Sequence, residues 1–263
     1  MTYVQLGPVN TWYEEQGDGE SLVLLHGGLT DSRTFGPVVP LFAKHFRTFA
    51  VDRRGHGRTA DVPGPLSYDV MAEDTIAFLE QVAGGPADLV GYSDGANVAL
   101  LVARQRPDLV RRLVSISGNY HHDGVIPGSL DGFAEDGDSW AAKNHAEVSP
   151  DPAENFPAFL ERYNAMIRTQ PTLTEQQLGD IGARTLVMAG DDDLITLEHT
   201  VSLYRGIAES ELSIVPGTSH LLAFEKPQLV FEQIIDFLTV EPVQTRLPIR
   251  RPLPIGDEAQ LAD

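Results

Sequence analysis

The stretch Asp88-Leu-Val-Gly-Tyr-Ser-Asp-Gly95 decides the fold of this chain. It begins as a short apolar run typical of a buried strand, and residues 96–105 follow it as an apolar helix that ends before Pro107. Between the two lies Gly-x-Ser-x-Gly, in which a sharp strand-to-helix turn exposes the Ser93 hydroxyl at the end of a sheet. The helix N-terminus adds free N–H groups beside that hydroxyl. This context favours a nucleophilic serine over an ordinary Gly-Ser turn that caps a helix.

Short apolar runs alternate with amphipathic segments along most of the chain. Such continuous runs are typical of parallel strands that helices cover on both faces. They occur at residues 21–25, 47–52, 88–92, 113–116, 185–189 and 212–215. Helical patterns occur at residues 67–83, 96–105 and 226–238, and an antiparallel edge hairpin is expected at residues 3–6 and 10–14. This alternation predicts a mostly parallel α/β sheet with right-handed crossovers.

One region interrupts this rhythm. Residues 119–182 contain no convincing strand, but helical patterns occur at residues 140–147 and 156–168. Long excursions of this kind are uncommon unless they are functional, so we expect a helical lid here. The core is then expected at residues 1–118 and 183–240. The proline-rich tail, residues 241–263, is expected to be extended or disordered and to carry no chemistry.

Composition excludes several classes of protein. The 263 residues include 19 basic and 38 acidic ones, so the formal charge is 19 − 38 = −19. This balance argues against nucleic acid or an anionic membrane surface as a partner. The absence of cysteine excludes disulfides, a cysteine nucleophile and thiolate metal sites. No signal peptide, membrane-spanning stretch or nucleotide-binding motif is recognisable, so we predict a cytoplasmic protein without a cofactor.

A serine nucleophile needs a base, and the base needs an acid that orients it. Both are expected at the carboxyl ends of later strands. The run at residues 185–189 is followed by Gly190-Asp-Asp-Asp193, and the run at residues 212–215 by Pro216-Gly-Thr-Ser-His220. The order along the chain is therefore serine, aspartate, histidine.

On these residues the chain, from about residue 21 to residue 238, resembles α/β-hydrolase-fold serine hydrolases. The matching motifs are Leu25-His-Gly-Gly28, Asp52-Arg-Arg-Gly-His-Gly-Arg58, the Ser93 elbow, Gly190–Asp193, Gly217-Thr-Ser-His220 and Glu225-Lys-Pro227. The resemblance implies a mostly parallel eight-stranded sheet flanked by helices, with a helical lid inserted after the sixth strand.

The resemblance also implies a role for individual residues. Ser93 is the nucleophile, His220 the general base and then acid, and Asp193 the orienting carboxylate, because the family places that acid three residues after the glycine. Asp191 is then expected in the turn, and Asp192 is expected to be exposed to solvent. The oxyanion hole is expected at the N–H groups of Gly28 and Asp94, with Leu29 as the alternative to Gly28. His26 and His56 are expected in structural turns.

Asp94 leaves two interpretations open. Its carboxylate can complement the helix dipole, or it can point into the pocket and bind a substrate cation. The elbow is similar to the Gly-Trp-Ser-Asp-Gly of valacyclovir-hydrolase-like enzymes, which hydrolyse α-amino-acid esters and bind the ammonium group with that aspartate. Here Tyr92 replaces the tryptophan, and Ala96 stands where a third glycine is expected.

The remaining site predictions concern the pocket and metal binding. Residues expected to line the substrate pocket are Leu29, Asp94, Tyr120, His121, His122, Trp140 and Leu221. The run His121-His122-Asp123 offers metal-ligand types, but adjacent residues rarely converge on one ion, so no metal is predicted. Aromatic and methionine side chains are expected to give the lid an apolar underside, namely Phe133, Trp140, Phe156, Phe159, Tyr163 and Met166.

The sequence therefore predicts a cofactor-independent hydrolase that cleaves a small carboxylic ester through an acyl-enzyme. Its partner is the small-molecule ester, and the sequence specifies no oligomeric state. The same residues could cleave a lactone, a thioester, an amide or a carbon–carbon bond. A perhydrolase or haloperoxidase side activity and a non-catalytic ligand receptor are further alternatives.

Overall fold

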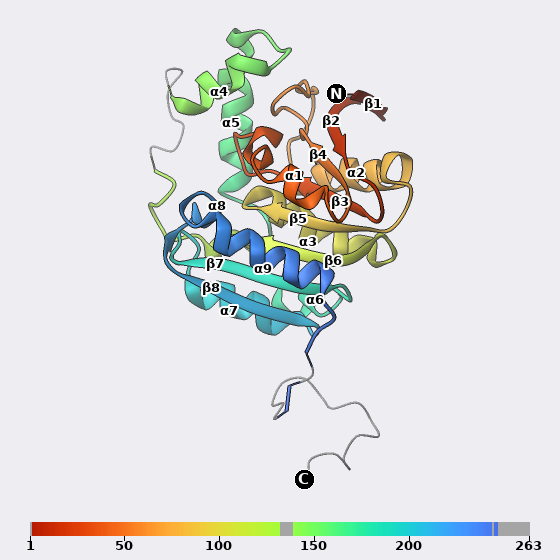
Figure 1. The fold of residues 1–263 in the computed structure, drawn as a ribbon. Helices are drawn as coiled ribbons and strands as arrows, with labels where there is room; N and C mark the ends of the chain where they lie inside the picture. The colour runs from red at the N-terminus through yellow and green to blue at the C-terminus, as the bar shows by residue number, and fades with distance from the viewer. Residues whose placement is uncertain (1, 132–138, 244, 247–263) are drawn as a thin grey trace.

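The computed structural model of the protein describes residues 2–131, 139–243, 245 and 246. Its centre is an eight-stranded sheet with the order β1-β2-β4-β3-β5-β6-β7-β8 (Figure 1). The strands are β1 (Thr2–Leu6), β2 (Val9–Gln16), β3 (Ser21–Leu25), β4 (Arg47–Val51), β5 (Ala87–Tyr92), β6 (Val110–Ile116), β7 (Arg184–Asp192) and β8 (Ser210–Ser219). The pairings β1–β2 and β2–β4 are antiparallel and the others are parallel. The predicted fold class is thus confirmed, with the hairpin at one edge.

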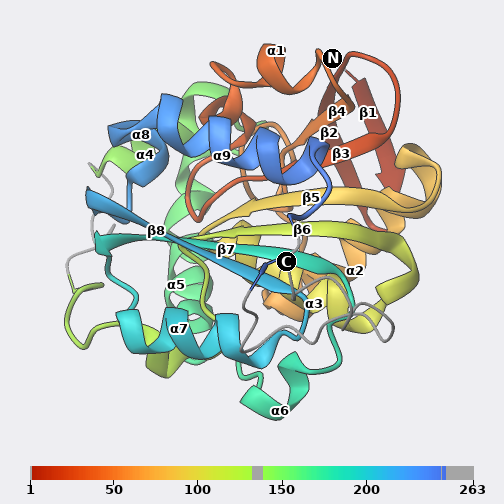
Figure 2. The same cartoon turned by 60° about the horizontal axis from the view of Figure 1, so that its bottom comes forward.

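Helices cover both faces of the sheet. They are α1 (Val39–Phe42), α2 (Tyr68–Phe78), α3 (Asp94–Gln105), α4 (Trp140–Val148), α5 (Phe156–Ile167), α6 (Glu175–Leu178), α7 (Leu197–Gly206), α8 (Leu222–Glu225) and α9 (Pro227–Thr239). Figure 2 shows α1 and α9 on one face and α2, α3 and α7 on the other. Within the described part of the chain, no helix is long and apolar enough to cross a membrane.

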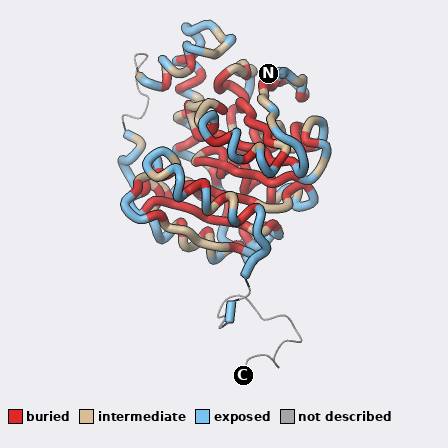
Figure 3. The backbone as a smooth tube through the Cα atoms, in the orientation of Figure 1, coloured by how far each residue is buried: buried red, intermediate tan, exposed pale blue. Residues whose placement is uncertain are grey.

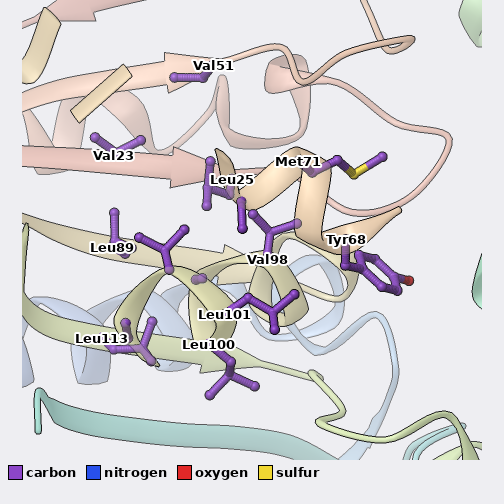
Figure 4. Close-up of a cluster of buried hydrophobic side chains, with 14 of the residues drawn as sticks. Val23, Leu25, Val51, Tyr68, Met71, Leu89, Val98, Leu100, Leu101 and Leu113 are labelled. Carbon is purple, nitrogen blue, oxygen red and sulfur yellow. The ribbon is translucent and has the colours of Figure 1, made fainter. Parts of the chain in front are cut away.

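The alternation of side chains along a strand explains the continuous apolar runs. In β3, Val23 and Leu25 join a cluster with α2 and α3, whereas Leu22 and Leu24 join a cluster with α1 and α9. Figure 4 shows Leu25 beside Val98 of α3, within the first of these clusters. Because both faces are covered, every residue of β3 is buried. The central strands form the buried centre of the molecule (Figure 3), whereas the edge strands β1 and β8 are partly exposed.

The ends of two predicted helices differ in the structure. The single helix expected at residues 67–83 is α2 followed by a π-helical turn at Leu79–Ala83, which ends at Gly84 with φ of 85°. Ser67 caps α2, because its side chain accepts a hydrogen bond from the Val70 N–H. The helix expected at residues 96–105 begins two residues earlier, at Asp94, directly after the candidate nucleophile.

The segment between β6 and β7, called the insertion below (residues 119–182), carries α4, α5 and α6. Phe156, Phe159 and Tyr163 of α5 are buried and belong to the same cluster as the α2–α3 face of the sheet. The insertion therefore packs on the sheet's own core. Phe133, and residues 244 and 247–263 of the predicted tail, lie outside the described residues.

Candidate active site

Ser93 stands in a strained turn between β5 and α3, with φ of 53° and ψ of −119°. The chain passes so closely here that a Cβ atom at Gly91 would collide with the Gly95 carbonyl, and one at Gly95 with the Leu25 carbonyl. The glycines of the motif are therefore a steric requirement. The Ser93 side chain makes no capping bond to α3, which leaves its hydroxyl available for chemistry.

The structure brings the three predicted triad residues into one hydrogen-bonded chain. His220 Nε2 lies 3.0 Å from Ser93 Oγ, and His220 Nδ1 lies 2.7 Å from Asp193 Oδ1. The three residues follow β5, β7 and β8 at the carboxyl ends of these strands, which all point the same way. This is the order of nucleophile, base and acid in which a proton can leave the hydroxyl.

Asp193 is the aspartate of the 191–193 run that reaches the histidine. Burial raises the pKa of Asp193, but hydrogen bonds from His220 and Ser117 and the charge of His220 outweigh this, so its pKa lies below the ordinary value. Asp191 instead accepts the Thr218 N–H at 3.0 Å, and Asp192 is exposed. Both assignments agree with the predicted division of the run.

Sequence reasoning missed Ser117. Its hydroxyl donates a 2.5 Å hydrogen bond to Asp193 Oδ2, and the Ile195 N–H donates to Oδ1 at 3.1 Å. Ser117 directly follows β6, so the strand between the nucleophile's strand and the acid's strand also contributes to the site. The only sequence signal was its position at the carboxyl end of that strand.

The predicted oxyanion loop lies against the elbow. A Cβ atom at Gly27 would stand 3.5 Å from Ser93 Cβ. Arg53 holds this loop in place, because its Nη2 donates hydrogen bonds to the carbonyls of His26 at 2.7 Å and Gly27 at 3.0 Å. The N–H of Asp94 opens α3 and has no partner within the helix.

His26 and His56 are buried and do not line the substrate cavity. Burial and the charge of Arg53 lower the pKa of His26 well below its ordinary value and that of His56 to about 3. Both imidazoles are therefore neutral near pH 7. His26 Nε2 accepts the Arg53 N–H at 3.1 Å, and His56 Nδ1 lies 2.8 Å from the Arg54 carbonyl, so both rings serve the local turns.

Asp94 has two partners that sequence reasoning did not anticipate. Its Oδ1 accepts a hydrogen bond from the Tyr68 hydroxyl at 2.7 Å, and its Oδ2 accepts one from the Tyr163 hydroxyl at 2.8 Å. Tyr68 opens α2 and Tyr163 belongs to α5, so the carboxylate joins the elbow, the main fold and the insertion. A role of Asp94 toward a substrate cation stays a prediction.

Both tyrosines are fixed as hydrogen-bond donors. Burial raises the pKa of Tyr68 and of Tyr163 well above the ordinary value, and the charge of Asp94 raises it further. The Tyr163 hydroxyl and Asp94 Oδ2 occupy the space that a side chain at position 28 would need, which explains the glycine there. The carboxylate thus lies directly beside the predicted oxyanion loop.

A cavity of about 140 Å³ opens at the candidate nucleophile. Six predicted site residues line it, namely Gly28, Ser93, Asp94, Trp140, His220 and Leu221. Tyr163, which was expected on the apolar underside of the lid, lines it as well. Residues that sequence reasoning missed also line it, namely Gly27, Thr30, Tyr68, Tyr92, Asn119, Val125, Leu130, Ile167, Gln170, Leu194 and Ile195. They come from widely separated segments and share no periodic pattern.

The other four predicted pocket residues are not among those that line this cavity. Leu29 is buried in the hydrophobic cluster on the α2–α3 face. Tyr120 stacks on His199 with ring centroids 4.0 Å apart, and its hydroxyl lies 2.8 Å from that of Ser202. His121 and His122 stack on each other in a partly exposed turn. Local packing therefore accounts for the absence of all four side chains from the cavity lining.

The same turn holds a group of metal-ligand types. The ligand atoms of His121, His122 and Asp123 lie within 4.8 Å of one another. His121 Nδ1 also accepts the Asp123 N–H at 3.2 Å, and structural zinc sites take four ligands. This group does not line the cavity of the candidate active site.

Comparison with known proteins identifies the family of the chain. A model described as the alpha/beta hydrolase family matches residues 22–233. The (E)-2-((N-methylformamido)methylene)succinate hydrolase of Acinetobacter baylyi is 24% identical over 251 residues, which cover 88% of this chain and 94% of that protein. A putative carbamate hydrolase of Caulobacter segnis is 26% identical over 246 residues, covering 84% and 92%.

Similarity to solved structures extends over the same region. The meta-cleavage product hydrolase of Pseudomonas fluorescens matches with a TM-score of 0.75 and 18% identity, over 90% of this chain and 97% of that one. At this identity the match shows the shared fold. The family model, by contrast, covers most of the chain, including the elbow and the segments that carry Asp193 and His220. The chain therefore belongs to the alpha/beta hydrolase family.

Proposed function

We propose that the protein is a serine hydrolase that cleaves small carboxylic esters through an acyl-enzyme. The observation that carries this proposal is the hydrogen-bonded chain from Ser93 through His220 to Asp193, which opens into a largely apolar cavity. A serine hydroxyl becomes a good nucleophile only when a positioned base can take its proton, and this chain supplies that base.

In the proposed reaction, Ser93 Oγ attacks the ester carbonyl and its proton passes to His220 Nε2. The N–H groups of Gly28 and Asp94 bind the oxyanion that forms, a contribution typically worth about 10²–10³ in kcat per donor. His220 then protonates the leaving alcohol. A water molecule, deprotonated by His220, attacks the acyl-enzyme and releases the acid and Ser93.

Two further parts of the site support this reaction. The lowered pKa of Asp193 keeps that carboxyl ionised, so it stabilises the imidazolium that forms at His220. Trp140, Tyr163 and Ile167 of the insertion line the cavity, and as a lid they would exclude water from it.

Amide or carbamate hydrolysis is the second candidate. The names of the two relatives above, a formamido-methylene succinate hydrolase and a putative carbamate hydrolase, favour it. The same three residues would carry that reaction, with an amine as the leaving group. Lactones, thioesters, carbon–carbon bonds, perhydrolysis and pure ligand binding stay alternatives that one substrate screen separates.

The test compares the wild type with Ser93→Ala on p-nitrophenyl acetate and butyrate and on matched anilides. We expect ester hydrolysis by the wild type and a loss of at least about 10³-fold in Ser93→Ala. Ser213→Ala, in β8 and away from the cavity, is the matched control and should retain the rate. A fluorophosphonate should add one adduct to the wild type and none to Ser93→Ala. Full activity of Ser93→Ala would refute the mechanism, and faster anilide cleavage would favour the second candidate.

A further inference from the structure

We propose that the substrate cavity accepts uncharged acyl groups and rejects acyl groups that carry a carboxylate, and that Asp94 sets this specificity. The inference rests on the proposed function, because it concerns the acyl group that Ser93 would receive. It follows from three features of the cavity. These are a fixed carboxylate in its wall, the absence of lysine and arginine among its described lining residues, and the pairing of the nearby arginines.

The first feature is the fixed position of the Asp94 carboxylate. Its side chain lines the cavity together with Ser93, and the residue is only 6% exposed. The hydroxyls of Tyr68 and Tyr163 hold one oxygen each, so the carboxylate cannot rotate away from the cavity without breaking both hydrogen bonds. The two hydroxyls are neutral donors and add no positive charge.

The second feature is the charge of the lining. Among the described residues that line the cavity there is no lysine or arginine. Arg53 interacts electrostatically with Asp94, but it is buried, its Nη2 donates to backbone carbonyls and the residue does not line the cavity. Residues 132–138, outside the described part, contain three acidic residues and no basic one.

The third feature is the pairing of the arginines around the insertion. Arg33 binds Asp31 at 2.8 Å and Glu147 at 2.6 Å. Arg162 binds Asp61, and Arg168 lies 3.6 Å from Asp131. A carboxylate that enters the cavity would therefore lose water without gaining a cation, while it faces Asp94 and a chain of net charge −19.

The experiment uses acyl groups of equal shape and different charge. Methyl 4-methylpentanoate ends in an isopropyl group where monomethyl succinate ends in a carboxylate of similar shape. Dimethyl succinate is a polar but uncharged reference. Acid release is followed by pH-stat at pH 7.5. In the wild type we expect kcat/KM for dimethyl succinate to exceed that for monomethyl succinate by about tenfold or more, since two like charges a few ångströms apart repel by more than this factor at an effective dielectric constant of about 20.

Asp94→Asn tests the residue. The amide keeps hydrogen-bonding groups for both tyrosines and removes the charge. The ratio of kcat/KM for dimethyl to monomethyl succinate should therefore fall toward about two, the statistical value set by the two equivalent ester groups of dimethyl succinate. Using this ratio within each variant cancels any general effect on the oxyanion hole. Glu154→Gln, an exposed acid of the insertion that does not line the cavity, makes the same change in net charge and should retain the wild-type ratio.

Each outcome decides a separate question. If no ester is cleaved, including p-nitrophenyl butyrate, the proposed function fails. If butyrate is cleaved but the wild type hydrolyses monomethyl and dimethyl succinate at equal rates per ester group, the function stands and the inference is wrong. This wild-type comparison holds even if Asp94→Asn does not fold. An unchanged ratio in a folded Asp94→Asn would refute the role of Asp94.

Discussion

Ser117 shows how a single hydroxyl can position the acid of the site. It follows β6 and donates to Asp193 Oδ2, whereas His220 occupies Oδ1. We expect Ser117→Ala to lower kcat/KM about tenfold, because one charge-assisted hydrogen bond is lost. Asp193→Ala should cost about 10³–10⁴-fold.

Kinetics with p-nitrophenyl butyrate check this prediction. Ser117→Cys keeps a side chain of similar size but donates only a weak hydrogen bond, so its rate should stay close to that of Ser117→Ala, which separates positioning from packing. Because the Ser117 bond lowers the pKa of Asp193, Ser117→Ala should also move the acidic limb of the rate profile toward higher pH. A Ser117→Ala variant with the wild-type rate and profile would exclude the role.

The sequence indicates Ser93, Asp193 and His220 because each directly follows a recognisable strand and belongs to a local motif. The hydrogen-bond partners of Asp94 and Asp193 carry no such signal. Tyr68 and Tyr163 are 26 and 69 positions from Asp94, and Ser117 is 76 positions from Asp193. Contacts between residues so far apart in the sequence depend on how α2, α5 and β6 pack. The sequence does not distinguish these serine and tyrosine residues from others in the same segments.

At the scale of elements, α5 is fastened to the elbow through one buried hydrogen bond. Tyr163→Phe removes the hydroxyl that reaches Asp94 and leaves that oxygen without its donor. We expect a loss of about 1–3 kcal/mol in the free energy of unfolding. Amide hydrogen exchange across Phe156–Ile167 should become faster, because the insertion loses its contact with the site.

The matched control for this prediction is Tyr68→Phe, which removes the other donor to the same carboxylate from α2. It should cost similar stability but leave exchange in α5 close to that of the wild type. If both variants accelerate amide exchange in α5 equally, the position of the Asp94 carboxylate, and not the hydrogen bond from Tyr163, determines the stability of the insertion.

Long elements were more predictable than short ones. The buried strands and α3 and α9 follow from continuous apolar runs and helical periodicity, which packing on both faces of the sheet requires. The π-helical turn at Leu79–Ala83 and the four-residue helices α6 and α8 lack such a signal, because one turn is too short to show a period.

At the scale of the whole molecule, buried histidines predict an acid-sensitive fold. His26 and His56 are buried and have lowered pKa values, about 3 for His56. Below the ordinary value of about 6.5 the unfolded chain binds protons that the folded chain does not, so stability falls as the pH falls. With a pKa of about 3, His56 should cost about 1.6 kcal/mol between pH 6.5 and pH 5, and His26 adds a loss of the same sign.

Urea unfolding at pH 5, 6, 7 and 8 checks this prediction. In His56→Asn the free energy of unfolding should depend less steeply on pH below about pH 6.5, because unfolding then takes up about one proton fewer. This holds whatever the effect of the substitution on stability at pH 7. His45→Asn, at an exposed position, is the control and should leave the slope unchanged. A wild-type stability that stays constant from pH 7 to pH 5 would contradict the buried neutral state of these histidines.

The carboxylate of Asp94 also has a consequence for the end of the reaction. On the proposed mechanism an uncharged ester enters the cavity, and deacylation leaves a free acid that ionises beside Asp94. The repulsion then acts on the product and not on the substrate. The enzyme should accordingly release its acid quickly and show weak product inhibition. The reaction at Ser93 turns an uncharged molecule that the cavity accepts into an anion that Asp94 repels.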